Sequence, residues 1–528
     1  MSVQFFPTYE QVLRSKFGGL ILDVVEYGAD AGGTFDSTGA WAKAALDLKA
    51  AGGGVLFADG DFLLSTLTPG QFSQQGAYYC VALPSNVVVW LAPGSTVTTP
   101  AIPSTASGQY VTLFVNDDPS GGNSNIHFVG GTYNLPAPLE NSTGMAAWDN
   151  FCAFMGVSDS TIGNDVTIVN GGCGFYPLSG QINTPTVLTD GHNDNNRISA
   201  KILDTPGSTF FQSTNSVFDG YIDGAWDDAF VIGSAGAGIK VLGMVLAAPV
   251  VSGKGATTGA VYVNNDNAVA STPEAMYDIE IRPTRIVGGQ GTFYSGEQAC
   301  IALGGPMRDI SIDTKASHGY VGLEAINSTV MGGRIRGDYY RNQQQGIYLS
   351  IDSGTATQYW DIDANVWSNN VANGASNSGF QVYTEGGNVI GGQAIIRGWE
   401  DGTGHQLNDI SAAEDTGGTL EIDFHDGWWQ DGVTLPANGF GHSTVRGNRG
   451  YNPRGPTTVA VPASGSATAA LPYDATFYIT QATAASSVSV QGQAIAIPVG
   501  GPTAIRVPAG QTLTPTYTTA PTWVVLGE

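Results

Sequence analysis

Basic residues are scarce in this sequence. Its 528 residues include 20 Lys and Arg against 45 Asp and Glu, which gives a formal net charge of −25 and a sequence pI near 4.3. Nucleic acids, anionic membranes and strongly polyanionic substrates bind proteins that present a basic surface. The composition therefore argues against all three as partners and leaves neutral or weakly charged glycans open.

Long apolar runs are absent as well. No stretch of 18 uncharged apolar residues occurs, and the opening MSVQFFPTYEQVLRSKF lacks the charged-then-apolar order of a secretory signal peptide. We expect a protein without membrane insertion that is not exported through a cleaved signal.

Cysteine is rare too. Four cysteines, Cys80, Cys152, Cys173 and Cys300, are too few for a disulfide framework in a chain of this length. Cys152 and Cys173 lie 21 residues apart. We expect these two to stack in successive repeats as buried free thiols.

Glycine and short β-branched runs are plentiful. The 73 Gly, the low charged fraction of 12% and the many Val, Ile and Thr runs favour an all-β protein with frequent turns. One hydrophobic core stops growing well before 528 residues, so the chain should hold several domains or an elongated repeat.

From residue 85 onward, short segments alternate apolar and polar residues, which predicts strands with one buried face. Ile198 to Phe218 is 20 residues and Phe218 to Ile239 is 21, while other steps are longer. A solenoid coil of about 20 residues with inserted loops gives this spacing. A β-sandwich or propeller is the alternative, but a sandwich needs fewer strands and no propeller blade signature occurs. The apolar phases are Val87/Val89, Ile126/Phe128, Val166/Ile168, Ile198/Ile202, Phe218/Ile222, Ile239/Val241, Ile279/Ile281, Ile310/Ile312, Ile362, Val389 and Leu420/Ile422/Phe424.

Residues 23 to 64 carry the most specific pattern. Asp36, Ser37 or Thr38 can cap a helix whose apolar stripe is Trp41, Ala44, Ala45 and Leu48, and Gly52 to Gly54 end it before a strand. The order GAD, GG, Asp-Ser-Thr, Ala-rich helix, GGG and apolar strand resembles the opening of pectate-lyase-like right-handed β-helix proteins. That group includes many bacteriophage tailspike and tail-fibre proteins.

The resemblance implies a right-handed parallel β-helix whose N-terminal end is covered by the helix. We expect a leader or attachment segment at 1–22, the capping helix and first strands at 23–84, and the β-helix at 85–455. After Pro456 the only charged residues are Asp474, Arg506 and Glu528, and short alternating runs predict a small β-sandwich at 456–528. This tail is similar to C-terminal modules of phage tail proteins, which implies an oligomerisation or binding module and a homotrimer.

The stretch SVFDGYIDGAWDDAFVIG, residues 216 to 233, concentrates acidic residues between apolar runs. Such density needs a solvated groove or a ligand, although Asp and Gly also suit tight turns. Asp204 and Asp227 are 23 residues apart, so they could stack in adjacent coils, with Asp223 and Asp228 close by. Carboxylates one coil apart suit the separation in a retaining glycosidase, and a larger offset suits an inverting one.

The string DDAFVI at 227 to 232 resembles the paired-aspartate strand of polygalacturonase-type glycoside hydrolases. This resemblance implies that Asp227 and Asp228 are the acid and base, with Asp204 or Asp223 as the third aspartate. The strand phase of Ile198 and Ile202 would carry Asp204 inward unless the strand ends at Leu203. We expect that end, because Thr205, Pro206 and Gly207 follow.

Aromatic and further acidic residues supply second candidates. Flat rings outside a solenoid can stack on sugars, and we single out Trp226, Trp399, Trp428 and Trp429 as substrate-binding, with core packing or contact between subunits as the alternative. Trp360 and Trp367 raise the same question. Single carboxylates are more often solvated surface groups, and those considered are Glu297, Glu324, Glu385 and the Glu400/Asp401/His405 cluster.

No metal motif is evident. DGHNDNN at 190 to 196 could offer oxygen ligands to calcium, but its spacing fits no EF-hand loop and a polar turn is the favoured interpretation. We therefore expect no cofactor, with calcium as the one alternative, and no P-loop, dinucleotide, zinc or serine-nucleophile motif occurs.

The resemblance to tailspike and tail-fibre proteins implies a virion protein of the phage tail that acts outside the host cell. It would bind, and could hydrolyse, a bacterial surface polysaccharide or wall glycan, with other tail or baseplate proteins as partners. A non-catalytic adhesin and a polysaccharide lyase are the alternatives. The acidic balance argues against the lyase, which needs calcium or a basic residue against a uronate.

Overall fold

The computed structural model forms two compact units, Met1–Tyr320 and Val321–Glu528, and each is described by itself. No helix among the described residues has the length and apolar character to cross a membrane. The structure describes residues 20–70, 77–100, 110–136, 140–141, 144–145, 149–178, 193–225, 228–246, 258–265, 276–288, 298–326, 329–352, 356–367, 369, 379–385, 388–399, 421–428, 443–446, 455–471, 474–480, 486–508 and 510–527.

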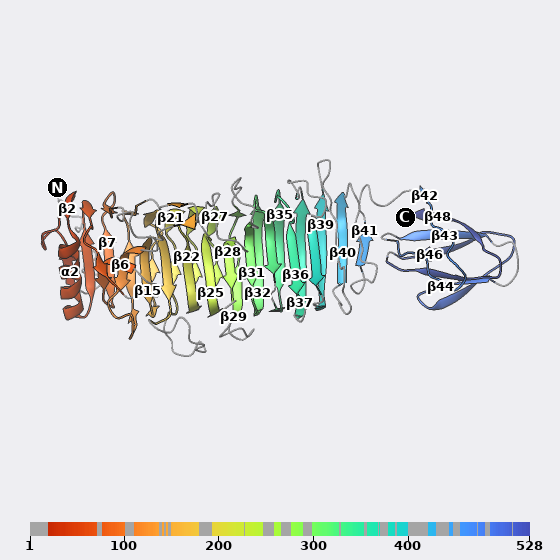
Figure 1. Ribbon diagram of the computed structural model, residues 1–528, viewed down its shortest axis with the longest axis horizontal. Helices are drawn as coiled ribbons and strands as arrows, with labels where there is room; N and C mark the ends of the chain where they lie inside the picture. The colour runs from red at the N-terminus through yellow and green to blue at the C-terminus, as the bar shows by residue number, and fades with distance from the viewer. Residues whose placement is uncertain are drawn as a thin grey trace, which may run out of the picture. The chain divides into compact units, whose positions relative to one another are not determined.

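Helix α2, Thr38–Ala51, lies at one end of the first unit and packs on β3 (Gly54–Ala58) and β6 (Ala77–Leu83) (Figure 1). The predicted stripe of Trp41, Ala44, Ala45 and Leu48 is buried. Ser37 is the N-cap residue, but the Asp36 carboxylate accepts the N–H of Thr38 at 3.1 Å. The prediction of a capping helix that Gly52 to Gly54 end is confirmed, and the structure shows that the C-cap residue Gly52 is left-handed.

Three ladders of parallel strands follow one another around the first unit. Ladder 1 contains β1 (Leu20–Asp23), β3, β7 (Val87–Leu91), β11 (Ile126–Val129), β17 (Thr161–Ile162), β20 (Arg197–Ile198), β23 (Val217–Phe218), β26 (Lys240–Val241) and β29 (Met276–Ile281). Ladder 2 contains β2 (Gly32–Asp36), β4 (Asp61–Leu63), β8 (Thr96–Thr98), β12 (Thr132–Asn134), β18 (Thr167–Val169), β21 (Lys201–Thr205), β24 (Tyr221–Ala225), β27 (Met244–Leu246) and β30 (Ile286–Val287).

Ladder 3 contains β6, β9 (Tyr110–Asn116), β15 (Asn150–Met155), β19 (Gly172–Tyr176), β22 (Ser208–Thr214), β25 (Phe230–Ala237), β28 (Thr258–Asn264) and β31 (Gln298–Gly304). The long strand β32 (Met307–Ser317) continues ladders 1 and 2. Each coil contributes one strand to each ladder, so the unit is a right-handed parallel β-helix, as predicted. Short strands flank the ladders: β5 (Thr68–Pro69), β10 (Asn123–Ser124), β13 (Glu140–Asn141), β14 (Gly144–Met145) and β16 (Val157–Ser158).

Apolar side chains from every coil fill the interior. All the predicted apolar phases from Val87 to Ile362 are buried, which confirms the assignment of the inward face. Cys152 lies opposite Cys173 in adjacent strands, and both are buried free thiols, as expected. One spacing is corrected: Phe218 pairs with Val241 and not with Ile239, because this coil gains residues between β24 and β25 and at the register shift within β25.

A column of left-handed residues forms the turn from ladder 3 back to ladder 1. Its members have φ between 49° and 64°, which Asn, Asp and Gly tolerate. Side-chain amides connect neighbours in the column, as Asn125 Nδ2 does to Asn86 Oδ1 at 3.0 Å. The column is Asn86, Asn125, Asp159, Asn195, Asn215 and Gly238.

The second unit continues with parallel strands. One set is β33 (Val321–Ile326), β36 (Ile347–Asp352) and β38 (Phe380–Glu385). The other is β34 (Val330–Met331), β35 (Arg334–Tyr340), β37 (Ala356–Trp367), β39 (Asn388–Trp399), β40 (Glu421–Trp428) and β41 (Ser443–Arg446).

A small antiparallel β-sandwich closes the chain, shown in blue in Figure 1, as the alternating runs after Pro456 predict. Phe477, Ile479, Val507, Leu513 and Val525 are among the residues of its core. One sheet contains β42 (Gly455–Thr457), β48 (Thr522–Gly527), β43 (Ala475–Thr480) and β46 (Thr503–Val507), and the other contains β45 (Gln493–Ile497), β44 (Ser486–Val490) and β47 (Leu513–Thr516).

The predicted domain boundaries at residues 22, 84 and 455 stay predictions. Most of the expected leader, residues 1–19, lies outside the described residues, while β1 begins at Leu20.

Candidate functional site

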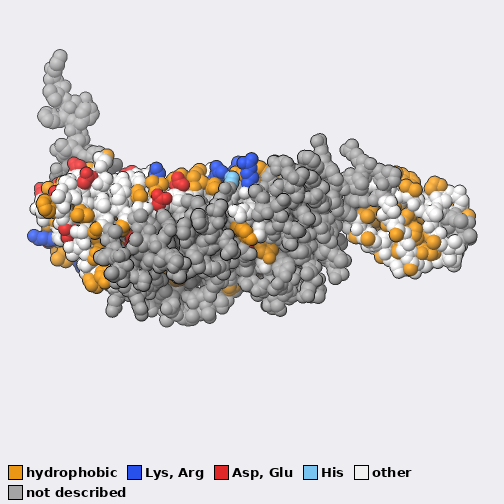
Figure 2. Space-filling view, turned by 45° about the horizontal axis from the view of Figure 1, so that its top comes forward, with side chains coloured by type: hydrophobic (Ala, Val, Ile, Leu, Met, Phe, Trp, Pro, Cys, Tyr) orange, Lys and Arg blue, Asp and Glu red, His pale blue; other side chains and the backbone are white. Residues whose placement is uncertain are grey.

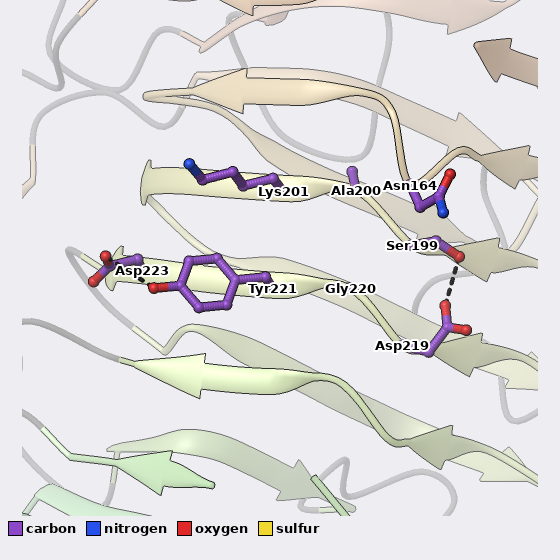
Figure 3. A pocket seen from close by; sticks show the side chains of 8 residues that line it. All are labelled: Asn164, Ser199, Ala200, Lys201, Asp219, Gly220, Tyr221 and Asp223. Atoms are coloured by element: carbon purple, nitrogen blue, oxygen red, sulfur yellow. Dashed lines mark hydrogen bonds between the residues drawn. The ribbon is translucent and has the colours of Figure 1, made fainter. Parts of the chain in front are cut away.

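An open groove of about 490 Å³ lies on the outer face of the first unit, where ladder 1 bends into ladder 2 (Figure 3). Three successive coils contribute to it. Its lining is polar except for one alanine and one glycine: Asn164, Ser199, Ala200, Lys201, Asp219, Gly220, Tyr221 and Asp223.

Strand alternation explains why these residues face outward. Ile198, Ala200 and Ile202 are buried, so Ser199 and Lys201 between them point to solvent. The next coil repeats this arrangement, with Phe218 and Ile222 buried. The bend itself depends on close packing, because a Cβ at Gly220 would lie 2.3 Å from the carbonyl oxygen of Ala200.

Asp219 forms the polar network at one end of the groove. Its carboxylate pairs with the Arg197 guanidinium and accepts a hydrogen bond of 2.5 Å from Ser199 Oγ. Partial burial raises the pKa of Asp219, but the hydrogen bonds from Arg197 and Ser199 and the charge of Arg197 outweigh this and lower it. Asp219 is therefore an ionised acceptor at neutral pH.

Tyr221 and Asp223 form the other end. The Tyr221 hydroxyl donates to Asp223 Oδ2 at 3.2 Å. Burial, followed by the charge and hydrogen bond of Asp223, raises the pKa of Tyr221, so the phenol stays protonated. Lys201 lies opposite Tyr221 in the preceding strand. In Figure 3 the carboxyls of Asp219 and Asp223 occupy opposite ends of the groove and do not converge.

Asp204 faces solvent, but not for the predicted reason. Strand β21 does not end at Leu203; it runs to Thr205. Asp204 takes a left-handed conformation, φ 51°, which turns its side chain outward and leaves Thr205 buried. Gly224 makes room for this carboxyl, since a Cβ there would lie 2.6 Å from Asp204 Oδ1.

The register also changes the predicted partner of Asp204. Leu203 pairs with Asp223 and Thr205 pairs with Ala225, so Asp204 lies opposite Gly224. The position one coil along from Asp204 is therefore 224 and not 227, because this coil has 20 residues and not 23, and Asp227 lies outside the described residues. Asp204 and Asp223 instead lie diagonally across adjacent strands, and both are exposed.

The remaining two aspartates of the predicted catalytic set differ in what can be said of them. Asp228 is half-buried, and its Oδ1 accepts the N–H of Gly259 at 2.8 Å in the next coil, which gives it a structural contact. Asp227 and its neighbour Trp226 lie outside the described residues.

The tryptophans divide between core and surface. Trp360 is buried, which is the core-packing alternative. Trp367 is half-buried and stacks on Tyr340 with ring centroids 4.2 Å apart and planes 4° apart. Trp399 lies opposite Trp367 and Trp428 opposite Trp399 in the backbone register. The side chains of Trp399 and Trp428, and all of Trp429, lie outside the described part.

Of the second acidic candidates, only Glu324 can be placed. This residue is 1% exposed, so the expectation of a solvated surface carboxylate is wrong for it. The side chain of Glu385 and residues Glu297, Glu400, Asp401 and His405 lie outside the described residues.

Within the described part of the chain, no three His, Cys, Asp or Glu side chains gather as a metal site. The predicted turn at 190 to 196 is described from Asn193 onward, where Asn193 and Asn195 are left-handed. Whether any cofactor binds, calcium included, stays a prediction.

Sequence reasoning missed most of the groove. The sequence patterns do not single out Asn164, Ser199, Lys201 or Tyr221, and Asp219 is one of the acidic residues in the stretch 216 to 233. The alternation of apolar and polar residues contained the signal. Residues at outward positions near Asp223, in its own coil and in the neighbouring coils, meet where ladder 1 bends into ladder 2.

The comparisons with known proteins rest on structure alone. No family model matches the chain, and no curated protein matches it by sequence. Among solved structures, a double mutant of the tailspike protein of E. coli bacteriophage HK620 is 11% identical, with a TM-score of 0.47, over 96% of this chain and 92% of that chain.

Two enzymes of similar fold are also matched. The A-module of a mannuronan C-5 epimerase from Azotobacter vinelandii is 14% identical over 81% of this chain and 98% of that chain, with a TM-score of 0.30. An exopolygalacturonase from Thermotoga maritima is 12% identical over 81% and 91%, with a TM-score of 0.33. The right-handed parallel β-helix that the resemblance implies is confirmed by this chain's own ladders of parallel strands.

The groove offers donors, acceptors and one aromatic ring on a regular ladder. Asp219 accepts, the Lys201 ammonium donates, and the Asn164 amide and Ser199 hydroxyl can do both. The lowered pKa of Asp219 makes it a poor general acid. This chemistry suits the binding of a polyhydroxylated ligand.

Proposed function

We propose that this protein is a tailspike-like attachment protein that binds a bacterial surface polysaccharide in the groove. The observation that carries the proposal is the set of polar groups that three successive coils present around one open concavity. Sugar hydroxyls need paired donors and acceptors at fixed positions, and side chains on parallel strands hold such positions better than side chains on loops.

Tyr221 and Asp219 would have distinct roles in binding. The Tyr221 ring offers an apolar face to a sugar ring while its hydroxyl stays fixed by Asp223. Asp219, ionised and held by Arg197, would accept hydrogen bonds from sugar hydroxyls. The virion location, the homotrimer and the tail or baseplate partners belong to the same proposal and rest on the sequence resemblance.

Hydrolysis is the second candidate function. Asp204 and Asp223 are exposed carboxylates on adjacent strands, which lie about 4.8 Å apart. Their diagonal placement falls near the range that glycosidase carboxylate pairs require, about 5 to 9.5 Å. Asp227 remains the third acid that the polygalacturonase-like string implies.

Asp223→Asn tests the site. It removes the charge at one end of the groove and keeps the shape, so we expect at least a fivefold loss of affinity for the host polysaccharide. Asp278→Asn is the matched control: Asp278 is an exposed residue of the same unit with φ 54°, which Asn tolerates. Affinity is measured by biolayer interferometry on immobilised polysaccharide.

The same variants separate the three functions. New reducing ends with wild type, lost in Asp204→Asn, Asp223→Asn or Asp227→Asn, support hydrolysis. Binding without any shortening of the glycan supports the adhesin, and an absorbance rise from unsaturated products supports the lyase. If Asp223→Asn and Asp278→Asn bind equally well, the groove is not the binding site.

A further inference from the structure

Two rows of outward residues run along ladder 2 and reach the groove. Strand register defines them, because each member pairs with its counterpart in the next coil. The first row is Thr96, Thr132, Thr167, Lys201 and Tyr221. The second row is Thr98, Asn134, Val169, Leu203 and Asp223. Tyr221 and Asp223 line one end of the groove, so both rows lead from the proposed binding site toward the N-terminal coils.

The three threonines of the first row face outward because the residues after them fill the core. These following residues, Val97, Tyr133 and Ile168, are buried, and side chains alternate between the two faces of a strand. The threonines themselves are half-buried. Each of three successive coils therefore presents one hydroxyl and one methyl group along the same line.

The fold fixes the spacing of these groups. Neighbouring strands lie about 4.8 Å apart, so the first row covers four spacings from Thr96 to Tyr221, about 19 Å. Threonine is β-branched, which limits its rotamers. A ligand that binds to such a row therefore loses little affinity to the ordering of protein side chains.

The hydroxyls in the middle of the row are available to a ligand. Among the described residues, no hydrogen-bond partner is found for the hydroxyl of Thr132 or Thr167. The Thr96 hydroxyl donates to the carboxylate of Asp61 in the preceding coil, and its oxygen can still accept. A threonine hydroxyl both donates and accepts, as the hydroxyl of a sugar does.

Charge is absent from this part of the outer face. Between Asp61 and Lys201, the outward positions of the two rows are Thr96, Thr98, Thr132, Asn134, Thr167 and Val169. The whole chain carries a net charge of −25, so the strip differs from the rest of the protein. Hydroxyl, amide and methyl groups without charge suit a neutral sugar better than an ionic ligand.

We propose that the bound polysaccharide lies along ladder 2, with neutral sugar residues continuing from the groove over Thr167, Thr132 and Thr96. The inference rests on the proposed function and specifies the direction and length of the ligand. Asn164 of the groove belongs to the same coil as Thr167, so the row continues the groove without a break. The methyl groups would contact the C–H faces of the sugars while the hydroxyls exchange hydrogen bonds with them.

Fragments of the host polysaccharide test this extension. They are prepared by partial acid hydrolysis, sized by gel filtration and titrated calorimetrically into the full chain. Wild-type affinity should rise with fragment length beyond the groove and then become constant. Thr132→Val should lower the affinity for the longest fragments about threefold, because it removes the hydroxyl and keeps the β-branched shape.

The order in which substitutions act gives a sharper test. The shortest fragment whose binding is weakened should become longer from Thr167→Val to Thr132→Val to Thr96→Val, because these positions lie progressively farther from the groove. A purely structural role of the threonines would weaken the binding of all fragments alike.

Thr161→Val is the matched control. Thr161 is a half-buried threonine of the same coil as Thr167, but it belongs to ladder 1, where it pairs with Arg197. Its substitution should leave the affinity unchanged at every length. Thr132→Ser keeps the hydroxyl and should retain most of the affinity, which separates the lost hydrogen bond from a folding defect.

The row and the groove fail differently. The row is overturned if wild-type affinity does not increase with fragment length, or if Thr132→Val and Thr161→Val have equal effects on the longest fragments. Asp223→Asn still reports on the groove in that case, through the shortest fragments. If these ignore Asp223→Asn while long fragments respond to Thr132→Val, the row stands and the groove fails. If wild type binds no fragment, both fail.

Discussion

At the residue scale, Asp149 shows how burial couples this fold to pH. Its side chain is 2% exposed, Oδ1 accepts the N–H of Val111 at 3.1 Å, and its carbonyl accepts the N–H of Gly172 at 3.2 Å. It therefore connects three successive coils of ladder 3. Burial raises the pKa of Asp149 to about 7, although the Val111 hydrogen bond works in the opposite direction.

Asp149→Asn should flatten part of the pH dependence of stability. The folded pKa lies above the ordinary value of 3.8, so the stabilising contribution is complete below about pH 4 and is lost as pH rises through about 7. The neutral amide avoids that loss. Above about pH 8 the variant should be more stable than wild type by an amount on the order of 1 to 3 kcal/mol.

Thermal unfolding of both proteins between about pH 4 and 9 checks this. The exposed Asp278→Asn variant serves as the control, because it makes the same substitution at the surface. Parallel curves for Asp149→Asn and wild type would contradict the role given to the buried carboxyl.

At the element scale, paired left-handed positions shape the outer face of ladder 2. Asp204 has φ 51° and Gly224, opposite it in the next coil, has φ 78°. Because the two left-handed residues lie opposite each other, each strand has one extra residue on its outer side. The pairing of the two strands continues unchanged beyond this point. This irregularity exposes Asp204 beside Asp223.

Gly224→Ala should destabilise the protein through two effects. A non-glycine residue at positive φ costs about 1 kcal/mol, and the new Cβ would lie 2.6 Å from Asp204 Oδ1, which adds on the order of 1 kcal/mol and displaces that carboxyl. Gly94→Ala separates the effects, because Gly94 has φ 87° and open space around its Cβ position.

Chemical denaturation of the two alanine variants gives the difference directly. We expect Gly224→Ala to lose more stability than Gly94→Ala and also to weaken polysaccharide binding. Equal losses of unfolding free energy in the two variants would mean that the close contact between the new Cβ and Asp204 does not destabilise the protein.

At the scale of the whole molecule, the proposed assembly depends on apolar surface with little charge. In the terminal β-sandwich, Val499 is 55% exposed and Val524 is 53% exposed, and Figure 2 shows apolar side chains spread over this module. Asp474 and Arg506, the two charged residues described there, pair with each other. Such a surface favours burial against other copies of the chain.

We expect wild type to be a homotrimer by size exclusion with light scattering, and Val499→Asp with Val524→Asp to dissociate it. Leu46→Asp is the control, because Leu46 is 63% exposed on the capping helix and its change should leave the mass unaltered. A monomeric wild type would exclude a tailspike-like assembly.

Much of the fold could be predicted from local sequence patterns. The stripe from Trp41 to Leu48 and the alternation around Ile198 or Phe218 depend only on which residues avoid water along a helix or strand, so they could be read without tertiary knowledge. The site was predicted less well. Asp223 is in the groove, whereas Asp228 contacts the backbone of Gly259 and Glu324 is buried.

The sequence by itself determined that acidic residues would cluster on the outside of a β-helix near residues 216 to 233, because alternation decides which side chains a coil buries. Only the tertiary structure decided which residues share a site. Thr96, Thr132, Thr167, Lys201 and Tyr221 are separated by 20 to 36 positions, since each coil carries a different loop length, and only strand register places them in one row. Likewise, the left-handed turn at Asp204 depends on the space above Gly224, which the next coil supplies.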